Sequence, residues 1–436
     1  MTTVMLKFYI ATMFLLHGLS PAPGIAFGFM VAAAALLVAL PTGLLMRRST
    51  RLRHDDGIFG GVFLLGLVPL LVAPDQAGLQ NLLYAGLWAV TWTVSFWWVR
   101  EWALATRLGF IDFSRAAAAG AMLLAVSILL EFSLANTVGL YLSDFVHFSV
   151  DEFPSATVLG DELRRPRGFT AEAGFSAIVF ECLLPLSLAW LLRGRWRRWL
   201  FAVLVLPAYL LLFSAASMVL LVSTLLVFMG LNMGWTRSLL IGTALAALVG
   251  LVSLTSDDAS WVLYEVIARK LLEFSPDELI DAAATFSRPE AYTLAVTIMT
   301  QQPWGIGWGG VSQAMANNLP LFGVSLRGSG LISIPLEIGA SAGLLGMVGY
   351  LLIVWRKLAR LTRIRSLDAR LAFISLMWVA LHHAVVLEFW FPMLWFSLAL
   401  ADTVVLRATG QPALGWRQSA QPGPQPRRFF STRSAA

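Results

Sequence analysis

An arginine-rich stretch ahead of a glutamate has the residue types needed to bind a phosphate. Arg164, Arg165 and Arg167 fall within four residues, and Glu172 follows just before an apolar run. The planar guanidinium group matches the oxygen pairs of phosphate, and a carboxylate at a helix N-terminus can orient or deprotonate a hydroxyl. The alternative is that these arginines pair with the acidic residues 161–162 or with lipid head groups.

A second set of candidates lies further along the chain. Arg288 begins a predicted helix, a glycine-rich turn follows at residues 305–310, and Arg327 precedes another apolar run. Glu337 lies about two turns inside that run, where a carboxylate must face a wet cavity or a partner. The structural alternative for Glu337 is to cap a helix break at the neighbouring proline and glycine.

The remaining titratable candidates are His382 and His383, which lie close to Glu388. Paired histidines near a glutamate suit proton transfer, although buried histidines more often serve packing. Glu181 is a further intramembrane carboxyl, predicted to be neutral or paired. The chain has no HExxH, CxxC or Walker pattern, so we expect no metal ion and no cofactor.

The elements that position these residues are predicted to be membrane helices. The chain has 436 residues, of which 58% are hydrophobic and only 13% charged, about half the charged share of a soluble protein. An all-α polytopic membrane protein follows, because helices satisfy their own backbone in lipid. We predict about twelve transmembrane helices, near residues 4–20, 24–46, 57–73, 80–98, 113–133, 173–192, 199–213, 216–234, 238–254, 331–354, 371–387 and 389–406.

The basic residues predict the orientation of these helices. Most of the 31 lysines and arginines fall on one side, in clusters at residues 47–53, 193–198 and 356–370, with Arg100 and the C-terminal tail. The positive-inside rule places that side in the cytoplasm. We therefore expect a multi-pass protein of the bacterial inner membrane with both termini cytoplasmic, and we do not expect it to bind nucleic acid.

The domain prediction is one transmembrane domain over residues 1–406, with a disordered basic cytoplasmic tail at 407–436. Two long periplasmic loops interrupt the domain at about residues 134–172 and 255–330. The second loop contains two predicted amphipathic helices, WVLYEVIARKLLEF and SRPEAYTLAVTIMTQQP.

Three segments resemble motifs of the O-antigen polymerase and O-antigen ligase superfamily of bacterial envelope glycosyltransferases. RPRGFTAEAGFSA is similar to an arginine-glycine segment that enters a membrane helix in the polymerases. RPEAYTLAVTIMTQQPWGIGWG resembles a loop helix that ends in a P-x-G-x-G turn, and SGLISIPLEIGASAGLLG resembles the closing L-x-E-x-G-x-x-G helix. The match covers about residues 130–350 at the level of pattern. Residues 327–330 lack the His-Asn of the ligases, which favours a polymerase.

The resemblance implies a GT-C-like architecture with its active site at the periplasmic face. It implies a polysaccharide polymerase that moves a growing glycan from undecaprenyl diphosphate onto a lipid-linked repeat unit, inverting and without a metal. Arg167 and Arg288 would bind the diphosphate with Glu172 or Glu337 as the base, and a second set would bind substrate: Arg164, Arg165, Arg327, His382 and His383. The partners are the undecaprenyl-diphosphate-linked oligosaccharide and the lipid bilayer, with a chain-length regulator and a flippase as candidates. The alternatives are an O-antigen ligase acting on lipid A-core and a transporter or flippase for lipid-linked oligosaccharides.

Overall fold

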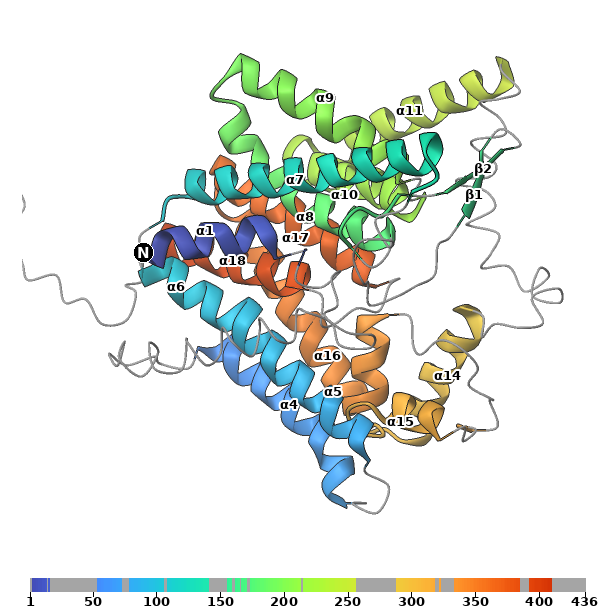
Figure 1. Ribbon diagram of the computed structural model, residues 1–436. Coiled ribbons are helices and arrows are strands. Elements are labelled where there is room, and N and C mark those ends of the chain that lie inside the picture. The colour runs from blue at the N-terminus through green and yellow to red at the C-terminus, as the bar shows by residue number, and fades with distance from the viewer. Residues whose placement is uncertain are drawn as a thin grey trace, which may run out of the picture.

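The structure is a computed structural model of the full chain. It describes residues 2–13, 15, 53–72, 78–105, 108–140, 155–158, 161–164, 166–170, 173–212, 215–255, 288–317, 321–322, 333–384 and 392–409. Within these ranges the protein is almost entirely helical, with one short β-hairpin (Figure 1).

The elements follow one another as Figure 1 labels them. The first half contains α1 (Thr2–Thr12), α4 (His54–Val72), α5 (Leu79–Thr91), the π-helix η2 (Trp92–Trp98), α6 (Val99–Ala105), α7 (Phe110–Thr137), β1 (Ser155–Val158) and β2 (Asp161–Arg164). The second half contains α8 (Ala173–Leu191), α9 (Arg195–Leu211), α10 (Ala215–Met233), α11 (Trp235–Thr255), α14 (Arg288–Gln301), α15 (Gly310–Ala316), α16 (Ile334–Thr362), α17 (Leu367–His383) and α18 (Pro392–Ala408).

Five helices among the described residues are long and apolar enough to cross a membrane. They are α4, the continuous run from α5 through η2 and α6 (Leu79–Leu104), α7, α8 and α16. Ser217–Met233 in α10 is a shorter apolar helix. The chain is therefore a multi-pass helical membrane protein, as its composition predicts.

The described spans are fewer than the twelve predicted from the sequence. The helices α9, α17 and α18 each have 17 residues. At 1.5 Å per residue they reach about 26 Å, short of a hydrocarbon core of roughly 30 Å. The predicted span at 24–46 lies outside the described residues, and α1 covers only 11 residues of the span predicted at 4–20.

The two predicted outer loops contain secondary structure. In the first, β1 pairs with β2 in an antiparallel hairpin that aligns Ser155 with Arg164, which the all-helical prediction did not include. In the second, α14 confirms the helix predicted at SRPEAYTLAVTIMTQQP. The other helix predicted there lies outside the described residues.

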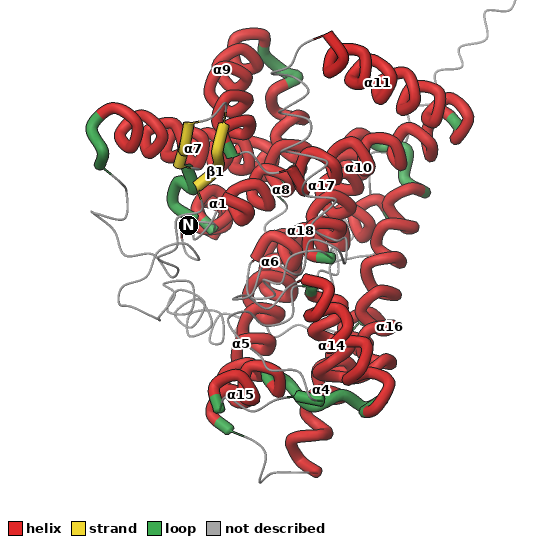
Figure 2. The backbone as a smooth tube through the Cα atoms, turned by 90° about the vertical axis from the view of Figure 1, so that its right-hand side faces the viewer, coloured by secondary structure: helices red, strands yellow, loops and turns green. Residues whose placement is uncertain are grey.

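The core of the bundle is built around α8, which packs against α7 on one side and α17 on the other. Phe180, Cys182 and Leu183 are fully buried there. A small residue, Gly120 of α7, allows this close approach, since a side chain at that position would press on Leu183 and on the Ala11 backbone of α1. Figure 2 shows a second group, in which α14 lies beside α16, and α15 beside α5.

Candidate functional site

Residues 166–170, which include Arg167, lie between β2 and α8 and form a turn that α7 and α8 hold in place. The backbone amides of Arg167 and Gly168 donate to Oε2 of Glu131 on α7, at 2.7 and 2.6 Å. The carbonyl of Arg167 accepts from Ser176 Oγ of α8 at 2.5 Å and from Thr170 Oγ1 at 3.0 Å. The turn is thus fixed to α7 and α8 at the same time.

Glycine is required at the centre of this turn. Gly168 has a φ of +63°, a left-handed conformation that side chains disfavour. A Cβ at this position would also lie 2.6 Å from Ser127 Oγ. The predicted Arg-Gly motif therefore has a local structural reason, independent of its chemistry.

The side chain of Arg167 is buried, with 1% of the residue exposed. Its guanidinium charge interacts electrostatically with the Glu131 carboxylate. Charge interactions are stronger in such a poorly solvated place, so an anion that reached this guanidinium would interact strongly with it. The sequence pattern indicated Arg167 as a site residue. It did not indicate Glu131, which is a glutamate inside an apolar helix.

Of the other predicted arginines and Glu172, the structure describes only the backbone positions of two arginines. Arg164 ends β2, and Arg288 is the first residue of α14. The remaining three candidates lie outside the described residues: Arg165, Glu172 and Arg327.

Glu337 lies in the first turn of α16 and is 2% exposed. Its Oε1 accepts a hydrogen bond from Ser341 Oγ at 3.2 Å. The helix breaks six residues after Glu337, at Gly343, where φ is 72° and ψ is 179°. The structural alternative for Glu337 placed a break near Pro335 and Gly339, but Pro335 lies at the start of the helix, where no N–H is needed.

The glycine-rich turn fills the break in α16. Ile306 N donates to Ala340 O at 2.8 Å, and Gly307 N donates to Ser341 O at 3.0 Å. Leu344 N donates in return to Pro303 O at 3.2 Å. Backbone groups that a straight helix would have paired internally are therefore paired with the turn.

The turn also attaches to the α4–α5 side of the bundle. Trp308 N donates to Gly66 O at 3.0 Å, and its indole N–H donates to Phe63 O at 2.9 Å. Asn81 Nδ2 donates to Trp308 O at 2.8 Å. Trp308 is fully buried, so this turn connects α4, α5 and α16.

Two predicted histidines end α17 inside the bundle. His382 Nδ1 lies 2.7 Å from Oε1 of Glu181 on α8, and the two side chains are 2% and 0% exposed. His383 Nδ1 lies 2.8 Å from Val379 O of its own helix. Glu181 was predicted to be neutral or paired, and its contact with His382 shows that it is paired. Glu388, the glutamate that the sequence places near these histidines, lies outside the described residues.

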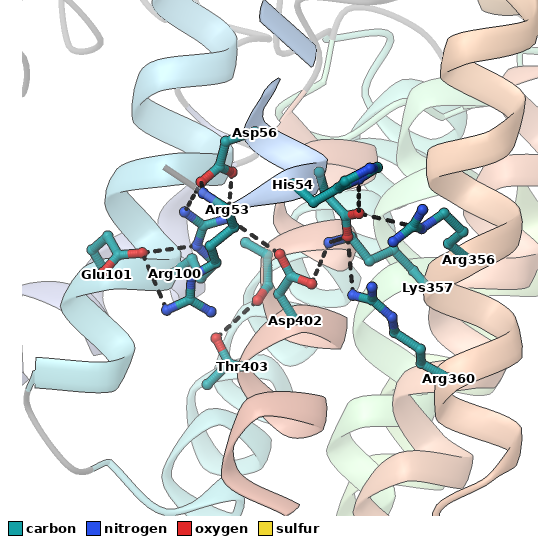
Figure 3. Close-up of polar contacts among 12 residues, drawn as sticks. Arg53, His54, Asp56, Arg100, Glu101, Arg356, Lys357, Arg360, Asp402 and Thr403 are labelled. Atoms are coloured by element: carbon teal, nitrogen blue, oxygen red, sulfur yellow. Dashed lines mark hydrogen bonds and ion pairs between the residues drawn. The ribbon is translucent and has the colours of Figure 1, made fainter. Parts of the chain in front are cut away.

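A buried ion-pair network, shown in Figure 3, joins four helices. Arg100 of α6 forms a bidentate ion pair with Asp56 of α4, in which Nη1 donates to Oδ1 at 2.6 Å and Nη2 donates to Oδ2 at 2.9 Å. Its Nη1 also donates to Oδ2 of Asp402 of α18 at 3.2 Å. Lys357 of α16 donates to Asp55 of α4 at 2.6 Å and also to Asp402. The Arg100 and Lys357 side chains are 1% and 0% exposed.

In the sequence, Arg100 and the basic cluster at 356–370 indicated only the orientation of the helices. The missed signal was acidic: Asp402 inside an apolar run, and Asp55-Asp56 at the start of another. Carboxylates in such positions require cationic partners. Asp55, Asp56 and Asp402 have as partners the buried cations Arg100 and Lys357, which the charge pattern had placed on a cytoplasmic surface.

Among the described residues, no three His, Cys, Asp or Glu side chains gather as a metal site. The expectation of metal-independent chemistry stays a prediction.

Fold and site together define a multi-pass helical membrane protein with buried polar clusters at both ends of its bundle. No protein-family model matches the chain, and no curated protein matches it.

Proposed function

We propose that the protein is a polysaccharide polymerase of the bacterial inner membrane. It transfers a growing glycan from undecaprenyl diphosphate onto a lipid-linked repeat unit at the periplasmic face, with inversion and without a metal. The proposal includes the twelve-span, GT-C-like topology with both termini cytoplasmic. Its starting point is the likeness of three sequence segments to O-antigen polymerases.

One structural observation supports the proposal best: the Arg167 turn and the arginine cluster at 193–198 lie at opposite ends of α8. The turn is hydrogen-bonded to the first part of this 19-residue apolar helix, and the cluster begins just after its last residue. If the cluster is cytoplasmic, as the positive-inside rule requires, Arg167 is held at the outer face. The lipid diphosphate of the proposed donor is at that face.

The chemistry requires a cation there. Breaking the bond between the anomeric carbon and the diphosphate leaves negative charge on the departing oxygen. A fixed guanidinium stabilises this charge without reorganising, and removing one such donor typically costs about 2.7–4 kcal/mol in the barrier. Arg167 takes this role in the proposal, with Arg288 as a second diphosphate-binding arginine, and Glu172 or Glu337 receives the proton of the attacking hydroxyl.

The test is a reconstitution with purified full-length protein and lipid-linked repeat units. The polymerase reading predicts a ladder of longer glycans on the lipid, together with free polyprenyl diphosphate. The ligase alternative predicts glycan on lipid A-core when that acceptor is added, and no ladder without it. Absence of both products would contradict the glycosyltransferase proposal.

A transporter of lipid-linked oligosaccharides is the second candidate, and the buried charges favour it. Transporters use broken helices and intramembrane ion pairs, and this chain has a break in α16 at Gly343 and the network around Asp402. The break in α16 supports a transporter less than it would if it were open, because its backbone groups are already hydrogen-bonded to the glycine-rich turn. Movement of a labelled lipid-linked sugar across proteoliposomes, without chain growth, would support the transporter.

A further inference from the structure

The pair formed by Glu181 and His382 connects α8 to α17, and the proposed function gives it no part in moving the proton. The distance between Nδ1 and Oε1 is 2.7 Å, and both side chains are almost completely buried. Placing a carboxyl and an imidazole inside a membrane bundle is costly, and pairing them offsets only part of the cost. Such a pair calls for a role beyond packing.

The hydrogen bonds determine which ring nitrogen of each histidine is basic. A carbonyl oxygen only accepts, so Nδ1 of His383 carries a hydrogen and donates it to Val379 O at 2.8 Å. Its Nε2 is then a proton acceptor, and it has no hydrogen-bond partner among the described residues. The Glu181 carboxylate likewise favours a hydrogen on Nδ1 of His382, which leaves Nε2 of that ring as the basic nitrogen.

The pair lies in the same half of the bundle as the Arg167 turn. Ser176, which holds the Arg167 carbonyl, precedes Glu181 by five residues on α8. At 1.5 Å per residue this is about 7.5 Å along the helix axis. His382 and His383 are the last residues of α17, at the end opposite the basic cluster that precedes that helix.

An imidazole suits the proton transfer better than the carboxylates considered above. Its pKa in water is close to neutral pH, where a general base is most effective. A carboxylate bonded to Nδ1 fixes the tautomer and stabilises the imidazolium once the ring is protonated. Glu337, in contrast, is bonded to the Ser341 hydroxyl on its own helix.

We propose that His382 is the proton acceptor of the transfer and that Glu181 is its positioning residue; this inference rests on the proposed function. The acceptor hydroxyl oxygen forms a bond to the anomeric carbon as the bond from that carbon to the diphosphate breaks. The diphosphate leaves with the electron pair, and the hydroxyl proton passes to Nε2 of His382. The imidazolium then returns its proton to water or to the diphosphate.

The test compares His382→Gln, Glu181→Gln and Glu181→Asp with wild type in the reconstituted elongation assay. Loss of a general base lowers the rate by about 10²–10⁴-fold, so His382→Gln is expected to lose that much kcat while KM for the donor stays within about threefold. Glu181→Gln is expected to show a smaller loss of kcat, and Glu181→Asp a smaller loss than Glu181→Gln. Cys182→Ala is the matched control, because Cys182 is buried on the same helix and contacts Ser375 and Ser397 instead.

A pH profile separates this role from a purely structural one. The titratable groups around the pair are His383 on α17, Cys182 on α8 and Tyr209 on α9. Folded Glu181→Gln lacks the carboxylate that stabilises an imidazolium, so its profile of kcat against pH should differ from that of wild type. An unchanged profile in folded Glu181→Gln would overturn the role of Glu181.

The outcomes also separate this inference from the proposed function. If wild type elongates glycan and His382→Gln does so within about threefold, the proton acceptor is another group and only this inference is wrong. If wild type does not elongate the glycan, the proposed function fails, and this inference fails with it. Size-exclusion profiles and thermal unfolding show which variants are folded. If His382→Gln does not fold, the isosteric Glu181→Gln provides the test.

Discussion

Lys357 on α16 donates a hydrogen bond to Asp55 on α4 at 2.6 Å, although 302 residues separate them in sequence. The same ammonium donates to Asp402, which also accepts from Arg100. One buried cation therefore connects α16 to both α4 and α18 (Figure 3). This contact fixes the C-terminal part of α16, the helix that carries Glu337 in its first turn.

Replacing Lys357 with methionine should strongly destabilise the protein. The change removes the cation but leaves Asp55 and Asp402 buried, and breaking a buried pair in this way costs about 3–5 kcal/mol. Thermal unfolding in detergent should show a clear fall in Tm. Arg363→Met is the control, because Arg363 is exposed at the C-terminal end of the same helix. Equal Tm values for the two variants would contradict the structural role of the network.

Glu131 should be required for the stability of the arginine turn. In Glu131→Ala the amides of Arg167 and Gly168 lose their acceptor, at a cost of about 1–3 kcal/mol for each group. Glu131→Gln keeps an acceptor oxygen and should lose less. The measurement is thermal unfolding of both variants beside wild type. Two variants of equal stability would show that the carboxyl oxygen does not hold the turn.

The break in α16 should require glycine at position 343. Its φ of 72° is unfavourable for any side chain, and a Cβ there would overlap the carbonyl oxygen of Pro303 in the glycine-rich turn. Gly343→Ala should therefore unfold at a markedly lower temperature. Gly86→Ala, in helix α5 with open space around it, should be neutral or stabilising by up to about 1 kcal/mol. A neutral Gly343→Ala would mean that the turn does not pack there.

The arrangement of these sites could be predicted only in part from the sequence. Membrane helices, the α14 helix and the turn after Pro303 follow from apolar length, periodicity and glycine content, all of which are local. The pairing of Glu181 with His382 and of Lys357 with Asp55 depends on contacts 201 and 302 residues apart. The fold alone decides which buried acid meets which base. Arg167 was found because three arginines cluster within four residues ahead of a glutamate, whereas Glu131 looked like one isolated acid in an apolar helix.

The orientation of α7 and α9 can be tested with single cysteines in a Cys182→Ala background. Val138→Cys is at the exposed end of α7, and Arg195→Cys is at the exposed start of α9. The positive-inside rule predicts that a membrane-impermeant thiol reagent labels Val138→Cys in intact spheroplasts. Arg195→Cys should react only after permeabilisation. The reverse pattern would place Arg167 in the cytoplasm and exclude a periplasmic site.

The most direct test of the account is the effect of Arg167→Gln on diphosphate release and glycan elongation by purified, folded protein. Arg195→Gln serves as the matched control, since that arginine is exposed at the opposite end of α8. We predict that Arg167→Gln slows both release and elongation by about 10²–10³-fold, in line with losing one stabilising donor, while Arg195→Gln behaves as wild type. Equal rates for Arg167→Gln and wild type would contradict the claim that this guanidinium stabilises the leaving diphosphate.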